Sequence, residues 1–253
     1  MNIVGTLALI RRDITRMFRV SIQTLITPWI TALLYIFIFG FVIGRRINLL
    51  PGVSYIDFVL PGIIMMNIIM SSFSQASSSL YFQRFMKSFE EILISPLSYF
   101  EIIIGFLAGG ILRGLIVGLG VYVIALYFTT ATISHFWLFI FYSIAVSAVF
   151  SLVGMLVGLF ANHFEHLAIL NTFVIMPLVF LGGVFNPISL LPSAVQNFVR
   201  LNPFFYFVDG IRFAMIGIRE ANPLIGVLII FGLIFSLGGL VWYLFKKGYK
   251  IKQ

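Results

Sequence analysis

The stretch that decides the fold runs from residue 114 to residue 164 and reads GLIVGLGVYVIALYFTTATISHFWLFIFYSIAVSAVFSLVGMLVGLFANHF. It contains no Asp, Glu, Lys or Arg. A helix needs about 20 mostly apolar residues to cross the hydrocarbon core of a bilayer, so the stretch is too long for one span. The polar run TTAT at 129–132 supplies a turn near its middle. We therefore predict two transmembrane helices here, over residues 101–128 and 135–160.

The composition of the whole chain agrees with a membrane protein. Of its 253 residues, 61% are hydrophobic and 9% are charged, whereas a soluble domain carries about 25% charged residues. So large an apolar excess must face lipid or neighbouring helices within lipid. The net charge of +8 does not indicate nucleic-acid binding, because the basic residues stand at the ends of apolar runs and form no separate basic domain. The lack of cysteine excludes disulfides and thiolate metal sites.

Four further apolar runs have the length of a span, and they cover residues 23–44, 58–83, 167–184 and 224–245. Pro177 is expected to kink the run over 167–184. With the two spans above, these runs predict an all-α integral membrane fold. It has six transmembrane helices in a single domain, residues 1–253.

Two segments are neither spans nor simple loops. Residues 3–20 place apolar side chains on one side of a helix and Arg12, Arg16 and Arg19 on the other. This pattern predicts an amphipathic helix on the membrane surface, and a short helix packed against its own protein is the alternative. Residues 186–217 are fairly apolar but contain three prolines. We predict short re-entrant or interfacial helices there, on the outer side and before the last span.

The basic residues predict the orientation in the membrane. With the N-terminus inside, the inner side receives ten of them: Arg11, Arg12, Arg16, Arg19, Arg84, Lys87, Lys246, Lys247, Lys250 and Lys252. The outer side receives five: Arg45, Arg46, Arg200, Arg212 and Arg219. Inner loops carry an excess of Lys and Arg, so both termini are expected in the cytoplasm and the protein in a bacterial cytoplasmic (inner) membrane.

Polar side chains follow one face of the second span at steps of four, three and four residues: Asn67, Ser71, Ser74 and Ser78. They can line a passage wetted from the cytoplasm, or they can allow close helix packing through small residues and hydrogen bonds. Asn171 and Thr172 in the fifth span present the same choice. The residues themselves leave both interpretations open.

Arg113 is the only full charge well inside a span. An arginine inside the membrane is a candidate functional residue; alternatively, the third helix extends into the cytosol and Arg113 reaches the inner headgroups. Glycines repeat around it and in the fourth span, at positions 105, 109, 110, 114, 118, 154 and 158. Small residues four apart let helices approach closely in lipid, so we interpret these glycines as packing positions.

The loop over residues 84–98, RFMKSFEEILISPLS, is amphipathic. Phe89 and Leu93 can be buried while Glu90 and Glu91 stay in water, and Pro96 ends the helix. A short helix presented to the cytosol between two spans suits the docking of a soluble partner; a solvated turn is the alternative.

The sequence shows no cluster of side chains that would form a catalytic site. The carboxylates are scattered, and no glycine-rich loop is followed by Lys-Ser or Lys-Thr, so ATP hydrolysis through a P-loop is excluded and no catalytic residue is predicted. His163, Glu165 and His166 place three potential metal ligands within four residues. We favour a turn that faces a partner protein over a metal site, and we expect the chain to bind no metal or cofactor.

Several short motifs resemble those of one family. They are EEILISP at 90–96, LGGVF at 181–185, LP at 191–192, LNP at 201–203, then Tyr206, Gly210 and Arg212, and PG at 61–62. With the order of the spans, they make the chain resemble, over nearly its whole length, the membrane subunit of ABC-2 type ABC transporters.

The resemblance implies a homodimer joined to two copies of a separate ABC ATPase subunit, which would bind ATP and Mg²⁺. It implies that the loop over 84–98 is the coupling helix, with contacts through Arg84, Lys87, Glu90, Glu91 and Pro96. It also implies a substrate path at the dimer interface, lined by the second and fifth spans. The polar residues above, with Arg113, are its candidates: Asn67, Ser71, Ser74, Ser78, Arg113, Asn171 and Thr172. The family exports drugs, lipids, polysaccharides and other bulky compounds, so a hydrophobic or amphiphilic substrate is expected, and its identity is left open.

Two other classes compete with an ATP-driven exporter. A secondary transporter is disfavoured because no span holds an acidic residue for ion coupling in its interior and no inverted pair of half-helices is visible. A membrane assembly or scaffold protein without transport is the third class. Co-purification of a partner ATPase would distinguish an ATP-driven exporter from such an assembly protein.

Overall fold

The computed structural model describes residues 2–44, 53–129 and 132–248. In this part of the chain the secondary structure is helical, and five helices are long and apolar enough to cross a membrane by length and composition. Their bounds are Ile22–Gly40, Tyr55–Phe85 (α3), Tyr99–Ala125 (α5), Phe136–Phe160 (α6) and Pro223–Lys247 (α11). The first comprises the π-helical turn η1 (Ile22–Ile26), α2 (Thr27–Tyr35) and part of the π-helical η2 (Ile36–Ile43).

The predicted fifth span is the shortest of the six. It corresponds to Glu165–Leu181, an apolar helix too short to count with the other five by length. It consists of α7 (Glu165–Leu170), the π-helical turn η4 (Asn171–Ile175) and α8 (Met176–Leu181), with Pro177 in the first turn of α8. The structure therefore supports five of the predicted spans, and the six-span count stays a prediction.

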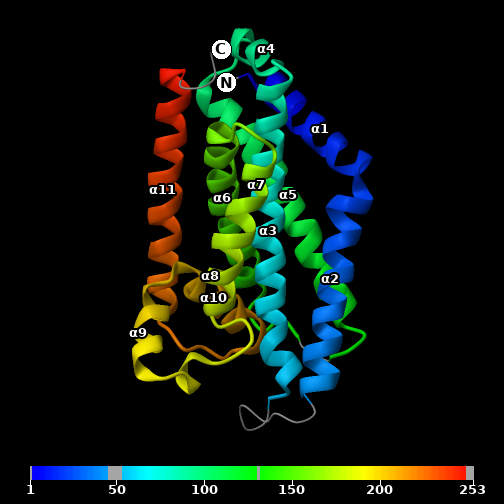
Figure 1. The fold of residues 1–253 in the computed structure, drawn as a ribbon, viewed down its shortest axis with the longest axis vertical. Helices are drawn as coiled ribbons and strands as arrows, with labels where there is room; N and C mark the ends of the chain where they lie inside the picture. Colours follow the sequence, from blue (N-terminus) through cyan, green and yellow to red (C-terminus); the bar gives the residue numbers. More distant parts are fainter. Residues whose placement is uncertain (1, 45–52, 130–131, 249–253) are drawn as a thin grey trace.

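Helix α3 stands in the middle of the bundle, with α2, α5 and α6 around it (Figure 1). The glycines explain how close the neighbours come. A Cβ atom built on Gly154 of α6 would lie 2.5 Å from the carbonyl oxygen of Phe73 in α3. One built on Gly114 of α5 would lie 2.2 Å from the hydroxyl of Ser72. The packing role predicted for these glycines is confirmed, because the contacts leave no room for a side chain.

Helix α1 (Ile3–Arg19) packs on its own protein. It lies against α5, and it buries Asp13 and Met17, whereas Val4 and Leu7 remain exposed. The alternative, a helix packed against its own protein, therefore holds for one face of α1, and its position on a membrane surface stays a prediction.

The two ends of the bundle carry different short helices (Figure 1). Helix α4 (Phe89–Ile94) lies at the end where α1 begins and α11 ends. The opposite end carries η5 (Ile188–Leu190), α9 (Ser193–Leu201) and α10 (Pro203–Ile216). Four of the basic residues that were used to predict the orientation in the membrane lie outside the described residues: Arg45, Arg46, Lys250 and Lys252.

Local signals set the limits of α10, within the segment expected to be re-entrant. The Asn202 side chain accepts a hydrogen bond from the Phe204 amide, and Pro203 occupies the first turn, where its missing N–H is not needed. Gly217 ends the helix with a φ of 71°, which favours glycine. Helix α10 packs against α3, α6 and α11, so α10 is part of the core, whereas most residues of α9 are exposed.

Candidate functional site

Helix α4 is fixed to the bundle by its apolar side. Phe89 is 1% and Ile92 is 6% exposed, and the Phe89 ring packs edge-on against Phe245 of α11 at 5.8 Å and stacks with Phe106 of α5 at 6.3 Å. The predicted burial of Phe89 is confirmed, while the Leu93 side chain lies outside the described residues. The segment is thus a helix packed on the bundle and not a solvated turn.

The other side of α4 is free and mixed in character. We call this the α4 surface, and it consists of Phe85, Met86, Lys87, Glu90, Glu91 and Ile94, all exposed. Ile94 is 85% exposed. Lys87 adopts a φ of 57° in the turn between α3 and α4, so the turn itself is tightly shaped. Exposed large apolar residues beside charges are typical of a protein–protein contact.

Arg84 and Pro96 were expected in the same docking group. The Arg84 guanidinium donates to the carbonyl oxygens of Gly158 at 2.9 Å and Ala161 at 3.3 Å. It therefore satisfies carbonyls at the end of α6 that the helix leaves unpaired, and it holds α3 to α6. Pro96 is exposed, and its carbonyl accepts from the side-chain amide of Asn2 at 3.5 Å.

The start of α1 is tied to the start of α5, directly after α4. The backbone amide of Asn2 donates to the Glu101 carboxylate. The same carboxylate forms a capping box with Ser98, accepting from its amide at 2.7 Å and its hydroxyl at 2.8 Å. One acidic side chain thus connects the first residues of α1 to the α4–α5 junction.

A buried polar group joins α1 to α3. Asp13 is 3% exposed, and both its carboxylate oxygens lie 2.8 Å from the donating hydroxyl of Ser79. Gln83 donates to the same hydroxyl at 3.3 Å, and Arg16 donates to the Ser78 hydroxyl at 3.3 Å. Burial raises the pKa of the Asp13 carboxyl, against the hydrogen bond from Ser79 and the nearby arginine charges.

The Arg113 side chain is buried inside the protein. It is 7% exposed. Its Nε donates to the Thr24 carbonyl of η1 at 3.3 Å, and its Nη1 donates to Oε1 of Gln75 in α3 at 3.4 Å. The charge therefore links the first span to α3 from its place on α5.

The four polar residues predicted to share one face of α3 differ in their burial. Asn67 and Ser71 are buried within the chain, and the Asn67 amide donates to the Ile63 carbonyl of its own helix at 2.9 Å. Ser74 and Ser78 are half-buried. Close packing explains the burial of Asn67 and Ser71, whereas Ser74 and Ser78 lie closer to the surface. The passage along α3 stays a prediction.

The second and fifth predicted spans touch each other. Turn η4 contacts α3, and it carries the two polar candidates of that span. Asn171 is half-buried, and its Oδ1 is buried without a hydrogen-bond partner in the described part of the chain. Thr172 is exposed. An unpaired acceptor is costly in an apolar setting, which favours a polar ligand or a second chain near Asn171.

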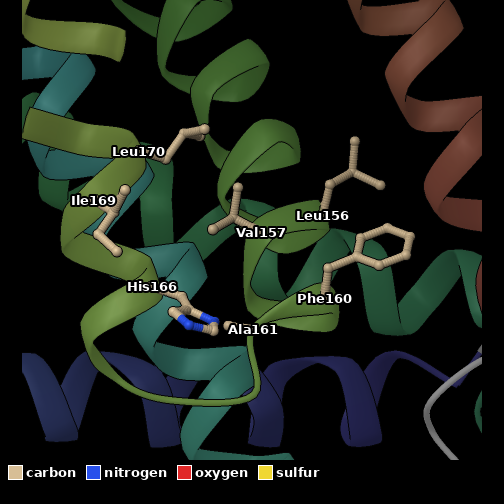
Figure 2. Close-up of a pocket in the computed structure, with 7 residues that line it drawn as sticks. All are labelled: Leu156, Val157, Phe160, Ala161, His166, Ile169 and Leu170. Atoms are coloured by element: carbon tan, nitrogen blue, oxygen red, sulfur yellow. The ribbon is translucent and has the colours of Figure 1, made fainter. Parts of the chain in front are cut away.

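A pocket of about 360 Å³ opens between α6 and α7 (Figure 2). Its walls are almost entirely apolar: Leu156, Val157, Phe160, Ala161, His166, Ile169 and Leu170. The only polar side chain among them is His166, whose ring lies 5.4 Å from that of His163. Among the described residues, no three His, Cys, Asp or Glu side chains gather as a metal site would require, so the structure does not bring Glu165 to this pair.

Sequence reasoning missed the role of Asp13 and Glu101 in fixing α1. Asp13 is the only acidic residue in a helix with several arginines, which was the available signal. Its partner Ser79 belongs to a serine-rich run of α3, and nothing in that run distinguishes it.

Comparison with known proteins agrees with this architecture. A family model described as ABC-2 type transporter matches residues 5–216, from α1 to the end of α10. The inner membrane transport permease YadH of Escherichia coli K12 is 40% identical over 241 residues, which cover 94% of this chain and 93% of the relative. Nodulation protein J of Rhizobium meliloti strain 1021 is 28% identical over 227 residues, covering 87% of this chain and 83% of the relative.

These matches run through α4, through the polar contacts of α1, α3 and α5, and through the segment before α11. They also agree with five helices able to cross a bilayer. The chain is an integral inner membrane protein, and it belongs to the ABC-2 type transporter family.

Proposed function

We propose that this chain is the permease subunit of an ATP-driven exporter. Two copies form the substrate path, and two copies of a separate ATPase subunit dock on the α4 surface and supply the energy. The observation that carries the proposal is the α4 surface itself, because exposed side chains such as Phe85, Met86 and Ile94 need a protein partner to cover them. The similarity to transport permeases supports the same assignment.

Two connections lead from the α4 surface into the bundle. The first is covalent, since the turn around Lys87 joins α4 directly to α3. The second runs through the Glu101 carboxylate to Asn2 and then along α1 to Asp13, which is bonded to Ser79 of α3. We propose that both connections move α3 when the ATPase moves α4. Arg113 then keeps the first span attached to α3 during that movement.

The substrate path in this proposal lies at the face of α3 that carries Ser74 and Ser78, beside η4 with Asn171 and Thr172. Two observations support it: α3 and η4 are in contact, and Asn171 has an acceptor without a partner in the described residues. The path is lined by small hydroxyl groups within apolar surroundings, so the proposed substrate is hydrophobic or amphiphilic.

The test is a charge reversal on the α4 surface. Glu90→Lys with Glu91→Lys should weaken ATPase docking, because like charges placed across an interface cost several kcal/mol while a rim pair contributes only about 0–1 kcal/mol. The measurements are substrate-stimulated ATPase activity of the reconstituted complex and retention of the ATPase on the same sample.

The matched variant is Glu90→Gln with Glu91→Gln, which removes the charges without reversing them. It should show a smaller loss in both measurements, and both variants should elute like the original protein in gel filtration. Unchanged activity and unchanged ATPase retention in the Lys variant would remove the α4 surface from the mechanism.

A further inference from the structure

A second pocket is lined by residues of η5, α9 and the connection between α10 and α11. These segments lie at the end of the bundle opposite α4 (Figure 1). The pocket has a volume of about 310 Å³. The residues at 218–220 that form one wall lie beyond the part of the chain that the family model matches, residues 5–216.

The walls are held in place by two carboxylates. Glu220 accepts hydrogen bonds from the amides of Ile188 at 3.0 Å and Ser189 at 3.2 Å. Asp209 accepts from the amides of Glu220 at 2.8 Å and Ala221 at 3.0 Å. These bonds tie two separate connections together and use both carboxylates for structure. The pocket is thus formed before any ligand arrives, which lowers the cost of binding.

Two arginines meet at this pocket from different parts of the chain. Arg200 stands near the end of α9, where the Tyr206 hydroxyl donates to its carbonyl at 2.9 Å. Arg219 follows α10, and its guanidinium lies 5.5 Å from the centre of the Phe213 ring. Both side chains are exposed, and within the described residues neither guanidinium has a hydrogen bond or an ion pair. The Glu220 carboxylate, the only acidic group in the lining, is already bonded to backbone amides.

The rest of the lining is largely apolar, with Phe58, Ile188, Phe205 and Ile218 among its residues. Guanidinium groups bind phosphate, sulfate and carboxylate through paired hydrogen bonds, and apolar walls accept hydrocarbon. We infer that this pocket binds an anionic amphiphile, with its acidic group on Arg200 and Arg219 and its apolar part against Phe58 and Phe205. This binding does not depend on the proposed ATP-driven export.

The inference is tested on the whole purified protein in dodecyl maltoside, by native mass spectrometry and thermal unfolding. Three probes separate headgroup from tail: phosphatidylglycerol, phosphatidylcholine with the same chains, and glycerol 3-phosphate. We expect saturable binding of phosphatidylglycerol at least about ten-fold tighter than that of either other probe, since both the charge-assisted bonds and the apolar contact are needed. Equal binding of the two lipids would overturn the inference. Glycerol 3-phosphate binding as tightly as phosphatidylglycerol would also overturn it, because the site would then take a free anion.

The variant Arg200→Gln with Arg219→Gln should lose this preference. The matched control, Arg11→Gln with Arg19→Gln, removes the same charge from exposed positions on α1 and should keep it. Equal loss in both variants would show that the attraction is only that of net charge, and the inference would be wrong.

A protection measurement keeps the inference testable if the arginine variant does not fold. The chain has no cysteine, so Ser189→Cys places one thiol at the pocket, where Ser189 is exposed. Phosphatidylglycerol should slow its reaction with a maleimide several-fold, whereas phosphatidylcholine should not. Thr15→Cys, at an exposed position of α1, serves as control and should show no such protection. Identical rates for Ser189→Cys with both lipids would contradict the inference.

Discussion

Gly154 of α6 lies directly against the backbone of α3, and its replacement by alanine tests whether this contact holds the bundle together. A Cβ atom there would lie 2.5 Å from the Phe73 carbonyl oxygen and 3.1 Å from the Ser77 amide nitrogen. Ordinary van der Waals contact begins at 3.4 Å. The two helices would therefore have to separate by the difference between 3.4 and 2.5 Å, about 0.9 Å. A gap of about 0.5–1 Å forfeits a quarter to a half of each dispersion contact that it opens.

Gly154→Ala should lower the free energy of unfolding by up to about 2 kcal/mol, which is the cost of overpacking less the gain in helix propensity. Overpacking costs about 1–3 kcal/mol, and the obstructing atoms are backbone atoms that cannot rotate away. The higher helix propensity of alanine offsets about 1 kcal/mol of this loss in the free energy of unfolding. The matched control is Gly239→Ala on α11, where a Cβ atom meets nothing within 4 Å; it should be neutral or stabilising by up to about 1 kcal/mol.

The measurement is equilibrium unfolding in mixed micelles of dodecyl maltoside and dodecyl sulfate, followed by tryptophan fluorescence and circular dichroism. The prediction concerns the sign of the difference between the two variants, which share the same chemical change. If Gly154→Ala is as stable as Gly239→Ala, the close approach of α6 to α3 does not carry the packing that we assign to it.

Three further predictions follow from the same geometry. Ser79→Ala removes the donor to the buried Asp13 carboxylate and should lower the free energy of unfolding by about 1–3 kcal/mol; adding Asp13→Asn should recover part of that loss in the same assay. Ser74→Leu, at a half-buried position, should reduce transport into inverted vesicles while dimer cross-linking and ATPase retention stay normal, and unimpaired transport would exclude this face of α3 from the path. Single cysteines should show that α4 is cytoplasmic: a maleimide added to intact cells should label Ser189→Cys and not Ile94→Cys, and the reverse pattern would invert the predicted topology.

The sequence predicted the order and type of the elements because these depend on local properties. Apolar length set the span over 58–83, which the structure extends to Tyr55–Phe85. The extension is held by tertiary bonds: the Tyr55 hydroxyl donates to the Phe185 carbonyl at 3.1 Å, and Asp57 accepts from Thr129. The amphipathic pattern of the loop over 84–98 predicted a helix, and Phe89–Ile94 forms one.

Membership of the ABC-2 type transporter family was also visible in the sequence. Its motifs, such as those at 90–96 and 181–185, depend on residue identity and spacing, which the sequence contains in full. The homologues confirm the family over most of the chain, so this part of the function needed no coordinates.

Only the tertiary structure decided which polar groups meet. From the sequence, Arg113 could lie in the core or at the headgroups, and the packing of η1, α3 and α5 placed it in the core. Arg84 belonged to a predicted docking loop, yet it binds the end of α6. Arg200 and Arg219 stand in different segments and share one pocket. The physical reason is that such pairings depend on the rotation and separation of helices distant in sequence, whereas periodicity and apolar length describe one helix at a time.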